Sequence, residues 1–270
     1  MNALVGERLS IITSKAQTTR HRIMGIVSGE NYQVVFSDTP GIIKPMYKLQ
    51  EKMMQFVVTA MTDADVFLLI TDVFEDMVLD ESYVERLNKS STPVLVVINK
   101  LDVAKQEQLE EKINKWRTLL PKAELYGVSA LKQFNLDKLM DRIVELLPFG
   151  NAFYAKDELT DKSERFFMSE IIREKILLNY QKEIPYSVEV VINTFKDEEK
   201  IIRIQADILV ERDSQKAIII GHQGKSLKKT GTMARQEMET FLGKQVFLEL
   251  FVKVDKDWRN NKNRLERYGY

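Results

Sequence analysis

The 270-residue sequence predicts a layered α/β domain followed by a smaller α+β domain. In the first half, short apolar runs rich in β-branched residues alternate with amphipathic stretches. Strands that are buried on both faces of a parallel sheet, and the helices between them, have this pattern. In the second half the order changes to a helix, two strands, two helices and a further strand, which is typical of an α+β domain.

The first-half elements follow from residue spacing. Strands are expected at residues 32–37, 66–70, 94–98 and 124–128, and helices at Glu107–Leu120 and Leu136–Leu147. Pro148 and Gly150 stop the last helix, and a polar, acidic stretch follows it. We therefore predict a first domain over residues 1–150, a linker over residues 151–163 and a second domain over residues 164–270.

The second-half elements are a helix over 164–180, strands over 185–194 and 201–211, helices over 213–220 and 225–241, a strand over 245–254 and a short terminal helix.

Composition excludes several classes of protein. The chain has no cysteine and two histidines, so it has no disulfide framework and no thiol nucleophile, and a structural zinc site is nearly excluded. No apolar run approaches the roughly 18 residues that span a bilayer. The first residues lack the basic-then-apolar order of a signal peptide. We expect a cytoplasmic protein.

Charge is unevenly distributed along this neutral chain. Residues 215–270 hold 12 Lys and Arg against 6 Asp and Glu, whereas residues 151–214 hold 10 against 14. A basic end on a neutral protein favours a polyanionic partner such as nucleic acid. The alternative is a set of lysine-rich helices that are simply solvated.

The first candidate motif is Asp38-Thr39-Pro40-Gly41, directly after the strand predicted at 32–37. A carboxylate at the carboxyl end of a strand can hold Mg²⁺ through water, and a glycine there can turn its N–H toward a terminal phosphate. Taken alone, this tetrapeptide is more often just a tight turn.

The second candidate motif is Asn99-Lys100-Leu101-Asp102, after the strand predicted at 94–98. Asp102 can accept two hydrogen bonds, from the ring N–H and the exocyclic amine of guanine. A base without that amine would leave the carboxylate underpaired, which gives selectivity. The stem of Lys100 can cover one face of the base. By itself the motif could be a polar loop.

The third candidate is Ser129-Ala130-Leu131, after the strand predicted at 124–128. Small residues here let a backbone N–H approach the guanine oxygen. This motif is weak alone. The three motifs together are far stronger, because each follows a strand at the sheet edge where open α/β sheets bind ligands.

These motifs resemble those of translation-type GTPases, and the run Lys15-Ala16-Gln17-Thr18-Thr19-Arg20-His21-Arg22 resembles the first switch loop of the Era family. The resemblance implies that Thr19 binds Mg²⁺ when GTP is present, with Thr18 as the second choice, and that Asp38 binds it through water. Ile42 stands where many GTPases place a glutamine that orients the attacking water. The implied catalytic residues are Thr19, Asp38, Gly41 and Ile42. The implied nucleotide-binding residues are Asp38, Thr39, Pro40, Gly41, Asn99, Lys100, Asp102, Ser129, Ala130 and Leu131.

A phosphate loop of the form G-x-x-x-x-G-K-[ST] should precede these motifs, and the sequence has none there. Residues 1–6 instead resemble the helix that follows this loop in the Era family. We expect an upstream segment in the natural protein. Gly224-Lys225-Ser226 mimics the end of the loop, but Ile219 occupies the position of its first glycine and the order of motifs is reversed, so we reject it as a nucleotide site.

The second domain carries a Gly-x-x-Gly sequence between its two central helices. In KH domains this loop clamps the backbone of single-stranded nucleic acid. No acidic residue lies between His222 and Gln236, so the following helix has a positive edge suited to phosphates. Ile218–Ile220 could line a groove for bases or belong to the core. The predicted RNA-binding residues are Gly221, His222, Gln223, Gly224, Lys225, Lys228, Lys229 and Arg235.

The resemblance to the Era family covers the whole chain, including Trp258-Arg259-Asn260-Asn261 near its end. It implies a Ras-like P-loop GTPase domain without its first strand, followed by a type II KH domain. It also implies GTP or GDP with Mg²⁺ as cofactor, the 3′ end of 16S rRNA and the small ribosomal subunit as partners, and a role in 30S assembly. A monomer is expected, with peripheral association at the inner face of the cell membrane as a further family property.

Two other interpretations stay open. The chain could be an RNA-binding module whose nucleotide half acts only as a scaffold. It could also belong to the double-GTPase family with a KH-like domain, which a single set of base-reading motifs and the presence of Gly-x-x-Gly disfavour.

Overall fold

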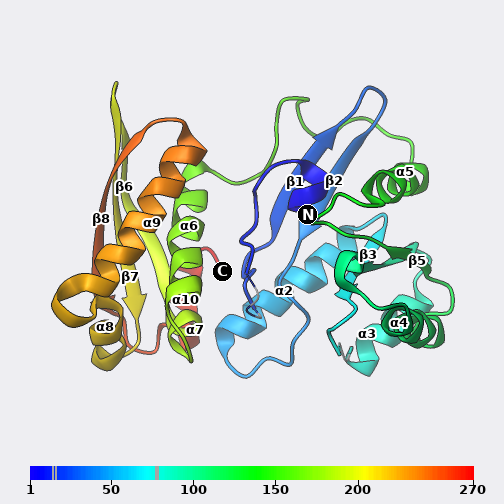
Figure 1. The fold of residues 1–270 in the computed structure, drawn as a ribbon, viewed down its shortest axis with the longest axis horizontal. Helices are drawn as coiled ribbons and strands as arrows, with labels where there is room; N and C mark the ends of the chain where they lie inside the picture. The colour runs from blue at the N-terminus through cyan, green and yellow to red at the C-terminus, as the bar shows by residue number, and fades with distance from the viewer. Residues whose placement is uncertain (14, 16, 77–78) are drawn as a thin grey trace. The chain divides into compact units, whose positions relative to one another are not determined.

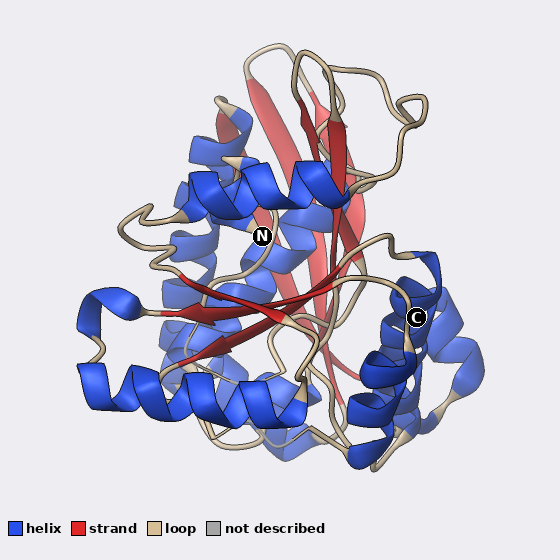
Figure 2. Ribbon diagram, turned by 90° about the vertical axis from the view of Figure 1, so that its right-hand side faces the viewer, coloured by secondary structure: helices blue, strands red, loops and turns tan. Residues whose placement is uncertain are grey.

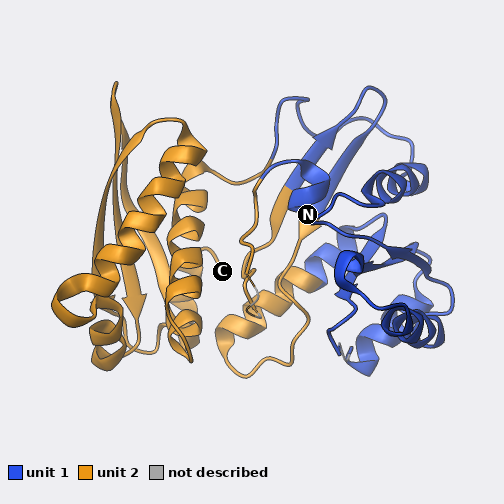
Figure 3. Ribbon diagram, viewed as in Figure 1, with its two compact units in different colours: residues 1–7, 25–36, 58–159 blue, residues 8–24, 37–57, 160–270 orange. Residues whose placement is uncertain are grey.

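The computed structural model describes residues 1–13, 15, 17–76 and 79–270. Its internal contacts divide the chain into two compact units (Figure 3). The first unit comprises residues 1–7, 25–36 and 58–159, and the second comprises residues 8–24, 37–57 and 160–270. Residues 8–24 and 37–57 of the amino-terminal half thus belong to the same unit as the carboxy-terminal domain. A single boundary at residue 150 would assign them to the first domain.

The first half alternates strands and helices as the sequence predicts (Figure 1). The strands are β1 (Ile23–Ser28), β2 (Gln33–Asp38), β3 (Phe67–Asp72), β4 (Val94–Asn99) and β5 (Glu124–Gly127). The helices are α1 (Asn2–Val5), α2 (Lys48–Asp63), α3 (Glu81–Lys89), the 3₁₀ turn η1 (Leu101–Val103), α4 (Gln106–Leu119) and α5 (Leu136–Leu146). The sequence analysis did not identify β1.

The strands of this half form two separate sheets within the described residues, β1–β2 and β3–β4–β5. In the second of these all pairs are parallel, and the register places Asp72 beside Asn99. β3 pairs with β4 on one side only, and its apolar residues are incompletely covered, with Ile70 half exposed.

Both sheets contribute to one core in the first unit. Val34 and Phe36 of β2 pack in the same cluster as Leu95 and Val97 of β4, and the apolar face of α5 covers them. Residues of α1 lie against this cluster. Because β4 is buried on both faces, its sequence is a continuous apolar run, as expected for a central parallel strand.

The carboxy-terminal domain contains the predicted elements (Figure 1). They are α6 (Glu164–Asn179), α7 (Ile184–Ser187), β6 (Glu189–Asp197), β7 (Ile201–Val210), α8 (Asp213–Ile220), η2 (His222–Gly224), α9 (Lys225–Leu242), β8 (Gln245–Val254), η3 (Trp258–Asn260) and α10 (Lys262–Arg267). Its sheet has the order β6–β7–β8, in which β6 pairs antiparallel and β8 parallel to β7. Figure 2 distinguishes the helices from the strands.

One element differs from prediction. The strand expected at 185–194 begins only at Glu189, because residues 184–187 form the single helical turn α7. Pro185 stands in the first turn of α7, where its missing N–H and fixed φ are tolerated. No helix in the described part of the chain is long and apolar enough to cross a membrane.

Candidate nucleotide and RNA sites

Asp38, the last residue of β2, lies at the centre of a small hydroxyl-rich cluster in the second unit. Ser10 Oγ donates a hydrogen bond to Asp38 Oδ2 at 2.6 Å. The backbone N–H of Thr39 and the side chain of Thr19 lie near enough to this carboxylate to lower its pKa. Burial raises the pKa of Asp38, and these groups oppose that rise. The structure thus brings together the two residues predicted to serve Mg²⁺, and adds Ser10 to them.

The two threonines of this segment differ in what their hydroxyls contact. Thr18 Oγ1 donates to the backbone carbonyl of Lys15 at 2.7 Å and so closes a local turn. Thr19 instead lies near enough to Asp38 to lower the pKa of that carboxylate. Of the two, only Thr19 lies beside the carboxylate of Asp38. Ala16 of the same sequence run lies outside the described residues.

The donor set around Asp38 fits Mg²⁺. Mg²⁺ prefers hard oxygen ligands, and proteins commonly hold it with one or two carboxylates plus substrate phosphates and water. Asp38 supplies a carboxylate, and Thr19 and Ser10 supply hydroxyl oxygens. Within the described residues no group of three or more His, Cys, Asp or Glu could hold a metal.

The residues after Asp38 differ in their exposure to solvent. Pro40 is buried, Ile42 is partly buried and Gly41 is exposed. A Cβ added at Gly41 would meet no heavy atom within 4 Å, so packing does not demand glycine there.

The second and third candidate motifs lie in the first unit, where two loops are joined by side-chain hydrogen bonds. Asn99, the last residue of β4, accepts the backbone N–H of Ala130 on Oδ1 at 3.0 Å. Ser129 Oγ donates to Asp102 Oδ1 at 2.6 Å. The second and third motifs, some 30 residues apart in sequence, are thereby brought together as the strand order predicts.

Lys100 has a left-handed backbone conformation, with φ of 65°. Its ammonium group forms an ion pair with Asp72 at 2.5 Å. Asp72 also accepts the backbone N–H groups of Phe74 and Glu75. Although burial acts in the opposite direction, these bonds and the lysine lower the pKa of Asp72. The sequence analysis missed Asp72. This residue ends β3, just as Asp38 ends β2 and Asn99 ends β4, so the same reasoning could have identified it.

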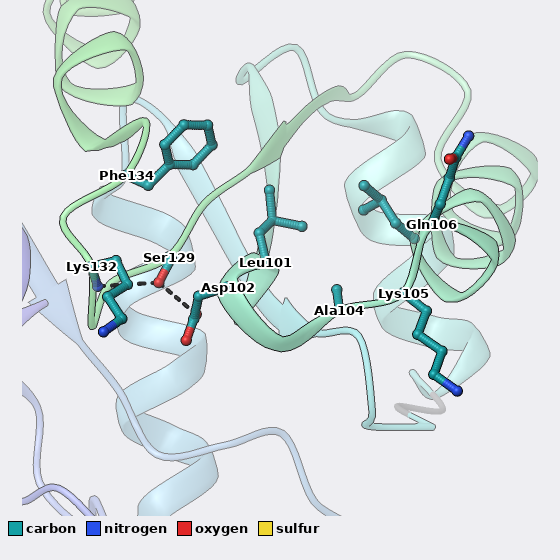
Figure 4. Close-up of a pocket in the computed structure, with 9 residues that line it drawn as sticks. Leu101, Asp102, Ala104, Lys105, Gln106, Ser129, Lys132 and Phe134 are labelled. Atoms are coloured by element: carbon teal, nitrogen blue, oxygen red, sulfur yellow. Dashed lines mark hydrogen bonds between the residues drawn. The ribbon is translucent and has the colours of Figure 1, made fainter.

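A cavity of about 420 Å³ opens beside Asp102 (Figure 4). Its volume is within the usual range of small-molecule sites. Figure 4 shows Ser129 pointing to Asp102, with Lys132 and Phe134 from the same loop. Leu131 does not line it and is 81% exposed. The lining residues are Leu101, Asp102, Ala104, Lys105, Gln106, Leu109, Ser129, Lys132 and Phe134.

The Gly-x-x-Gly loop forms the turn η2 between α8 and α9. Gly221 and Gly224 have φ of 69° and 75°, a region that L-residues with side chains avoid. A Cβ at Gly221 would also collide with Ser226 Oγ. At Gly224 nothing lies within 4 Å, so the backbone is open to a close approach.

The basic edge beside this loop is mostly open. Lys225, Lys228 and Lys229 are exposed along the start of α9. Arg235 is half-buried and pairs with Glu239 at 2.6 Å, so part of its charge is used within the helix. His222 and Gln223 are exposed at the loop.

The isoleucines at the end of α8 could either line a groove for bases or belong to the core, and the structure shows both kinds of environment. Ile219 is fully buried and belongs to the core, whereas Ile218 is 50% exposed. The Gly224-Lys225-Ser226 sequence follows a helix, whereas a phosphate loop follows a strand, in agreement with its rejection as a nucleotide site.

Family models match both halves of the chain. A model described as a 50S ribosome-binding GTPase matches residues 1–100, and a KH domain model matches residues 183–259. GTPase Era of Syntrophus aciditrophicus (strain SB) is 44% identical over 273 residues, which cover 100% of this chain and 89% of that protein. GTPase Era of Staphylococcus haemolyticus (strain JCSC1435) is 39% identical over 272 residues, covering 100% of this chain and 91% of that protein.

Two solved structures resemble the whole chain. One is Era in complex with MgGDPNP and nucleotides 1506–1542 of 16S ribosomal RNA, with a TM-score of 0.93, 36% identity and coverage of 100% of this chain and 92% of that one. The other is a variant of Aquifex aeolicus Era bound to GDP and AlF₄⁻, with a TM-score of 0.93, 37% identity and coverage of 100% and 93%. A P-loop GTPase domain followed by a KH domain, matched along its full length, shows that this chain belongs to the Era family of GTPases.

Proposed function

We propose that this protein is a GTPase that binds single-stranded RNA at the 3′ end of 16S rRNA and acts in assembly of the small ribosomal subunit, with GTP hydrolysis timing its release. The observation that carries the proposal is the hydrogen bond from Ser129 to Asp102, which joins two of the three nucleotide motifs. The Era relative crystallised with MgGDPNP and 16S rRNA nucleotides supplies the partner class.

Asp102 would read guanine. Ser129 holds one carboxylate oxygen of Asp102, which fixes the plane of the group before a base arrives. An oriented carboxylate can accept both the ring N–H and the exocyclic amine of guanine, and adenine offers no such pair. The hydrogen bond from the Ala130 N–H to Asn99 fixes the neighbouring loop, and the ammonium of Lys100 pairs with Asp72. The proposed base-binding residues are Asn99, Lys100, Asp102, Ser129, Ala130 and Leu131.

Thr19 and Asp38 would hold Mg²⁺, which when bound would neutralise charge on the phosphates of the nucleotide. Thr39, Pro40 and Gly41 would place backbone groups against the terminal phosphate. Ile42 cannot orient water by hydrogen bonding, and hydrolysis aided by neither a glutamine nor an arginine finger is slow. Slow hydrolysis suits a timer.

The loop from Gly221 to Gly224 would clamp RNA. Its two glycines let phosphates approach the backbone, and the exposed lysines of α9 add charge beside it. Ile218, half exposed at the end of α8, offers an apolar surface for a base. The proposed RNA-binding residues are Gly221, His222, Gln223, Gly224, Lys225, Lys228, Lys229 and Arg235.

A nucleotide-independent RNA-binding protein is the second candidate, favoured by one observation. The sequence has no G-x-x-x-x-G-K-[ST] before its other motifs. Such a loop offers several charge-assisted bonds of roughly 1.5–3 kcal/mol each, and losing about four would cost some 6 kcal/mol or about 10⁴-fold in affinity.

Titration with GDP and GTP in the presence of Mg²⁺ separates the two candidates. It is done on this chain and on a chain extended upstream by a phosphate-loop segment, with RNA binding measured in parallel. The GTPase proposal expects tight guanine-nucleotide binding and GTP hydrolysis in the extended chain. If neither chain binds nucleotide while both bind RNA, the second candidate replaces it.

A further inference from the structure

The two helices on either side of the Gly221–Gly224 loop are joined by buried hydrogen bonds. Tyr180, directly after α6, is 6% exposed, and Thr230 of α9 is fully buried. The hydroxyl of Tyr180 donates to the backbone carbonyl of Ile219 in α8 at 2.7 Å. The same hydroxyl accepts a hydrogen bond from Thr230 Oγ1 at 3.3 Å. One phenol therefore contacts both the helix before the loop and the helix after it.

These bonds form a hydroxyl relay of three side chains, Asn179, Thr230 and Tyr180, with a defined direction. Asn179 Nδ2 donates to Thr230 Oγ1 at 3.3 Å. Thr230 in turn donates to Tyr180, which donates to Ile219. Burial raises the pKa of Tyr180, although the hydrogen bond from Thr230 opposes this rise, so the phenol keeps its proton at neutral pH and remains a donor. Consecutive hydrogen bonds of this kind strengthen one another in a low-dielectric interior.

The relay ends on the last turn of α8, directly before the loop. The last four carbonyl groups of a helix have no partner within the helix, so a buried one needs a partner from elsewhere. Tyr180 supplies that partner to Ile219, two residues before Gly221. Ile219 is fully buried whereas Ile218 is half exposed. Holding the Ile219 carbonyl therefore also fixes which isoleucine of this turn faces solvent.

The loop itself is built on the ends of the two helices. The N–H of Gly221 donates to the carbonyl of Ala217 at 2.9 Å, and the N–H of Gly224 donates to the carbonyl of Gly221 at 3.2 Å. Gly221 lies so close to Ser226, at the start of α9, that a Cβ on Gly221 would collide with its hydroxyl. The conformation of the loop therefore depends on how α8 and α9 are held against each other.

We propose that Tyr180 and Thr230 are positioning residues for RNA binding, whose hydroxyl relay holds α8 and α9 so that the Gly221–Gly224 loop has the conformation that accepts an RNA backbone. Both side chains are buried, so they act through the loop and not by contact with RNA. A loop that is held in advance loses less conformational entropy when RNA binds. Without the relay only a fraction of the molecules would have the competent loop, and the apparent affinity falls by that fraction. The inference rests on the proposed RNA binding.

Two substitutions of nearly unchanged shape break the relay at different points. Tyr180→Phe removes the donor to Ile219, and Thr230→Val removes the hydroxyl that donates to Tyr180. Thr230→Ser keeps a hydroxyl at the same place and is the rescue variant. Tyr268→Phe is the matched control, because it also removes a phenol hydrogen bond from the carboxy-terminal domain, the 2.6 Å bond to Asp255, which is not part of the relay.

RNA affinity is measured by fluorescence anisotropy with an RNA of the sequence of 16S nucleotides 1506–1542, at a temperature at which melting curves show every variant to be folded. Tyr180→Phe and Thr230→Val should each bind at least about five-fold more weakly than the parent, which corresponds to about 1 kcal/mol, a typical net hydrogen bond. Thr230→Ser and Tyr268→Phe should bind as the parent does.

A second readout follows the loop without RNA. The chain has two histidines, and one of them, His222, is exposed in the loop. The NMR signals of its imidazole therefore report on the loop conformation. They should move in Tyr180→Phe and Thr230→Val and keep their parent positions in Thr230→Ser and Tyr268→Phe. A relay that only stabilised the domain would lower the melting temperature of these variants without moving the His222 signals.

The outcomes are distinguishable. Parent-like RNA affinity in both Tyr180→Phe and Thr230→Val overturns the inference, even if both variants melt at a lower temperature. An equal loss of affinity in Thr230→Ser or in Tyr268→Phe also overturns it, because packing or general stability would then account for the effect. A parent chain that does not bind this RNA overturns the RNA-binding function itself, and the inference falls with it.

Discussion

Ser129 Oγ lies 2.6 Å from Asp102 Oδ1 and donates a hydrogen bond to it, although the two residues belong to loops that follow different strands. The bond does two things at once. It satisfies a serine that is 1% exposed, and it fixes the rotation of a carboxylate that is otherwise open to solvent. A preoriented acceptor loses less conformational entropy when a base binds, so we expect this bond to contribute to nucleotide affinity.

Ser129→Ala should weaken GDP binding. A hydrogen bond to a charged group contributes about 1.5–3 kcal/mol, so the affinity should fall by at least roughly 10-fold. Calorimetric titration on the chain extended upstream measures this. Ser90→Ala, in the loop after α3, is the control and should leave affinity unchanged. Equal affinities for the parent and Ser129→Ala would show that the bond does not preorganise Asp102.

Asp38→Asn should stabilise the fold at neutral pH while removing the carboxylate proposed to serve Mg²⁺. Burial raises the pKa of Asp38 above the ordinary aspartate value, so the folded state holds this proton more tightly than the unfolded state does. The free energy of unfolding therefore falls as the pH rises from the ordinary aspartate pKa to the raised pKa that Asp38 has in the folded state. Above that raised pKa the loss is complete and constant.

The melting temperature of Asp38→Asn at pH 7 is therefore expected above that of the parent, by roughly 2–4 °C for each 1 kcal/mol relieved. The difference should vanish below the ordinary aspartate pKa, where both states are protonated. Asp65→Asn, in an exposed loop position, serves as the control. If Asp38→Asn melted below the parent at pH 7, the prediction that ionised Asp38 destabilises the fold would be wrong.

Asp72 gives the opposite pH dependence. Its folded pKa is lowered, so its contribution to stability is complete above the ordinary aspartate pKa and is lost as pH falls through the lower folded value. Asp72→Asn should melt below the parent at pH 7, and the gap should close in acid. Because Lys100 is half exposed, the ion pair itself contributes only about 0–1 kcal/mol. A gap that does not change between neutral and acidic pH would refute this assignment.

Lys228→Ala combined with Lys229→Ala should weaken RNA binding at every salt concentration tested. For single strands, each phosphate contact contributes about 0.7 to the magnitude of the slope of log affinity against log salt. The slope of the double variant should therefore be smaller in magnitude by about 1.4 than that of the parent. Fluorescence anisotropy over a salt series measures this slope. The pair Lys89→Ala and Lys138→Ala, exposed in the first unit, should keep the parent slope.

Gly221→Ala and Gly224→Ala should differ from each other in stability, but both should bind RNA more weakly than the parent. Both place a side chain at positive φ, which costs about 1–2 kcal/mol. Gly221→Ala additionally forces Ser226 to move, so it should be the less stable variant. Each Cβ would also hold phosphates away from the loop, so both should bind RNA more weakly than the parent. Wild-type RNA affinity in both variants would argue that the loop is not the RNA clamp.

Local patterns predicted the elements that position the candidate sites. β4 is a continuous apolar run, and its end marks Asn99 without any knowledge of tertiary contacts. The same reasoning reaches Asp38 at the end of β2. It fails for α7, where a short apolar stretch with a proline forms a helical turn although its composition also fits a strand.

Long-range contacts were not predictable in this way. Arg20 is a charged residue in a polar run, and a sequence window favours exposure for it. Its burial results from carbonyls more than 160 residues away. Ser10 likewise gives no local sign that it bonds to Asp38. The spacing of apolar residues in the sequence reveals which residues follow a strand. Hydrogen-bond partners that are distant in sequence can be identified only from the structure.

The one-sided pairing of β3 has a practical consequence for work with the purified protein. An unpaired strand edge with partly uncovered apolar side chains is a template for another strand. Preparations of this chain should therefore self-associate as concentration rises, and an added β-forming peptide that occupies the edge should keep them dispersed.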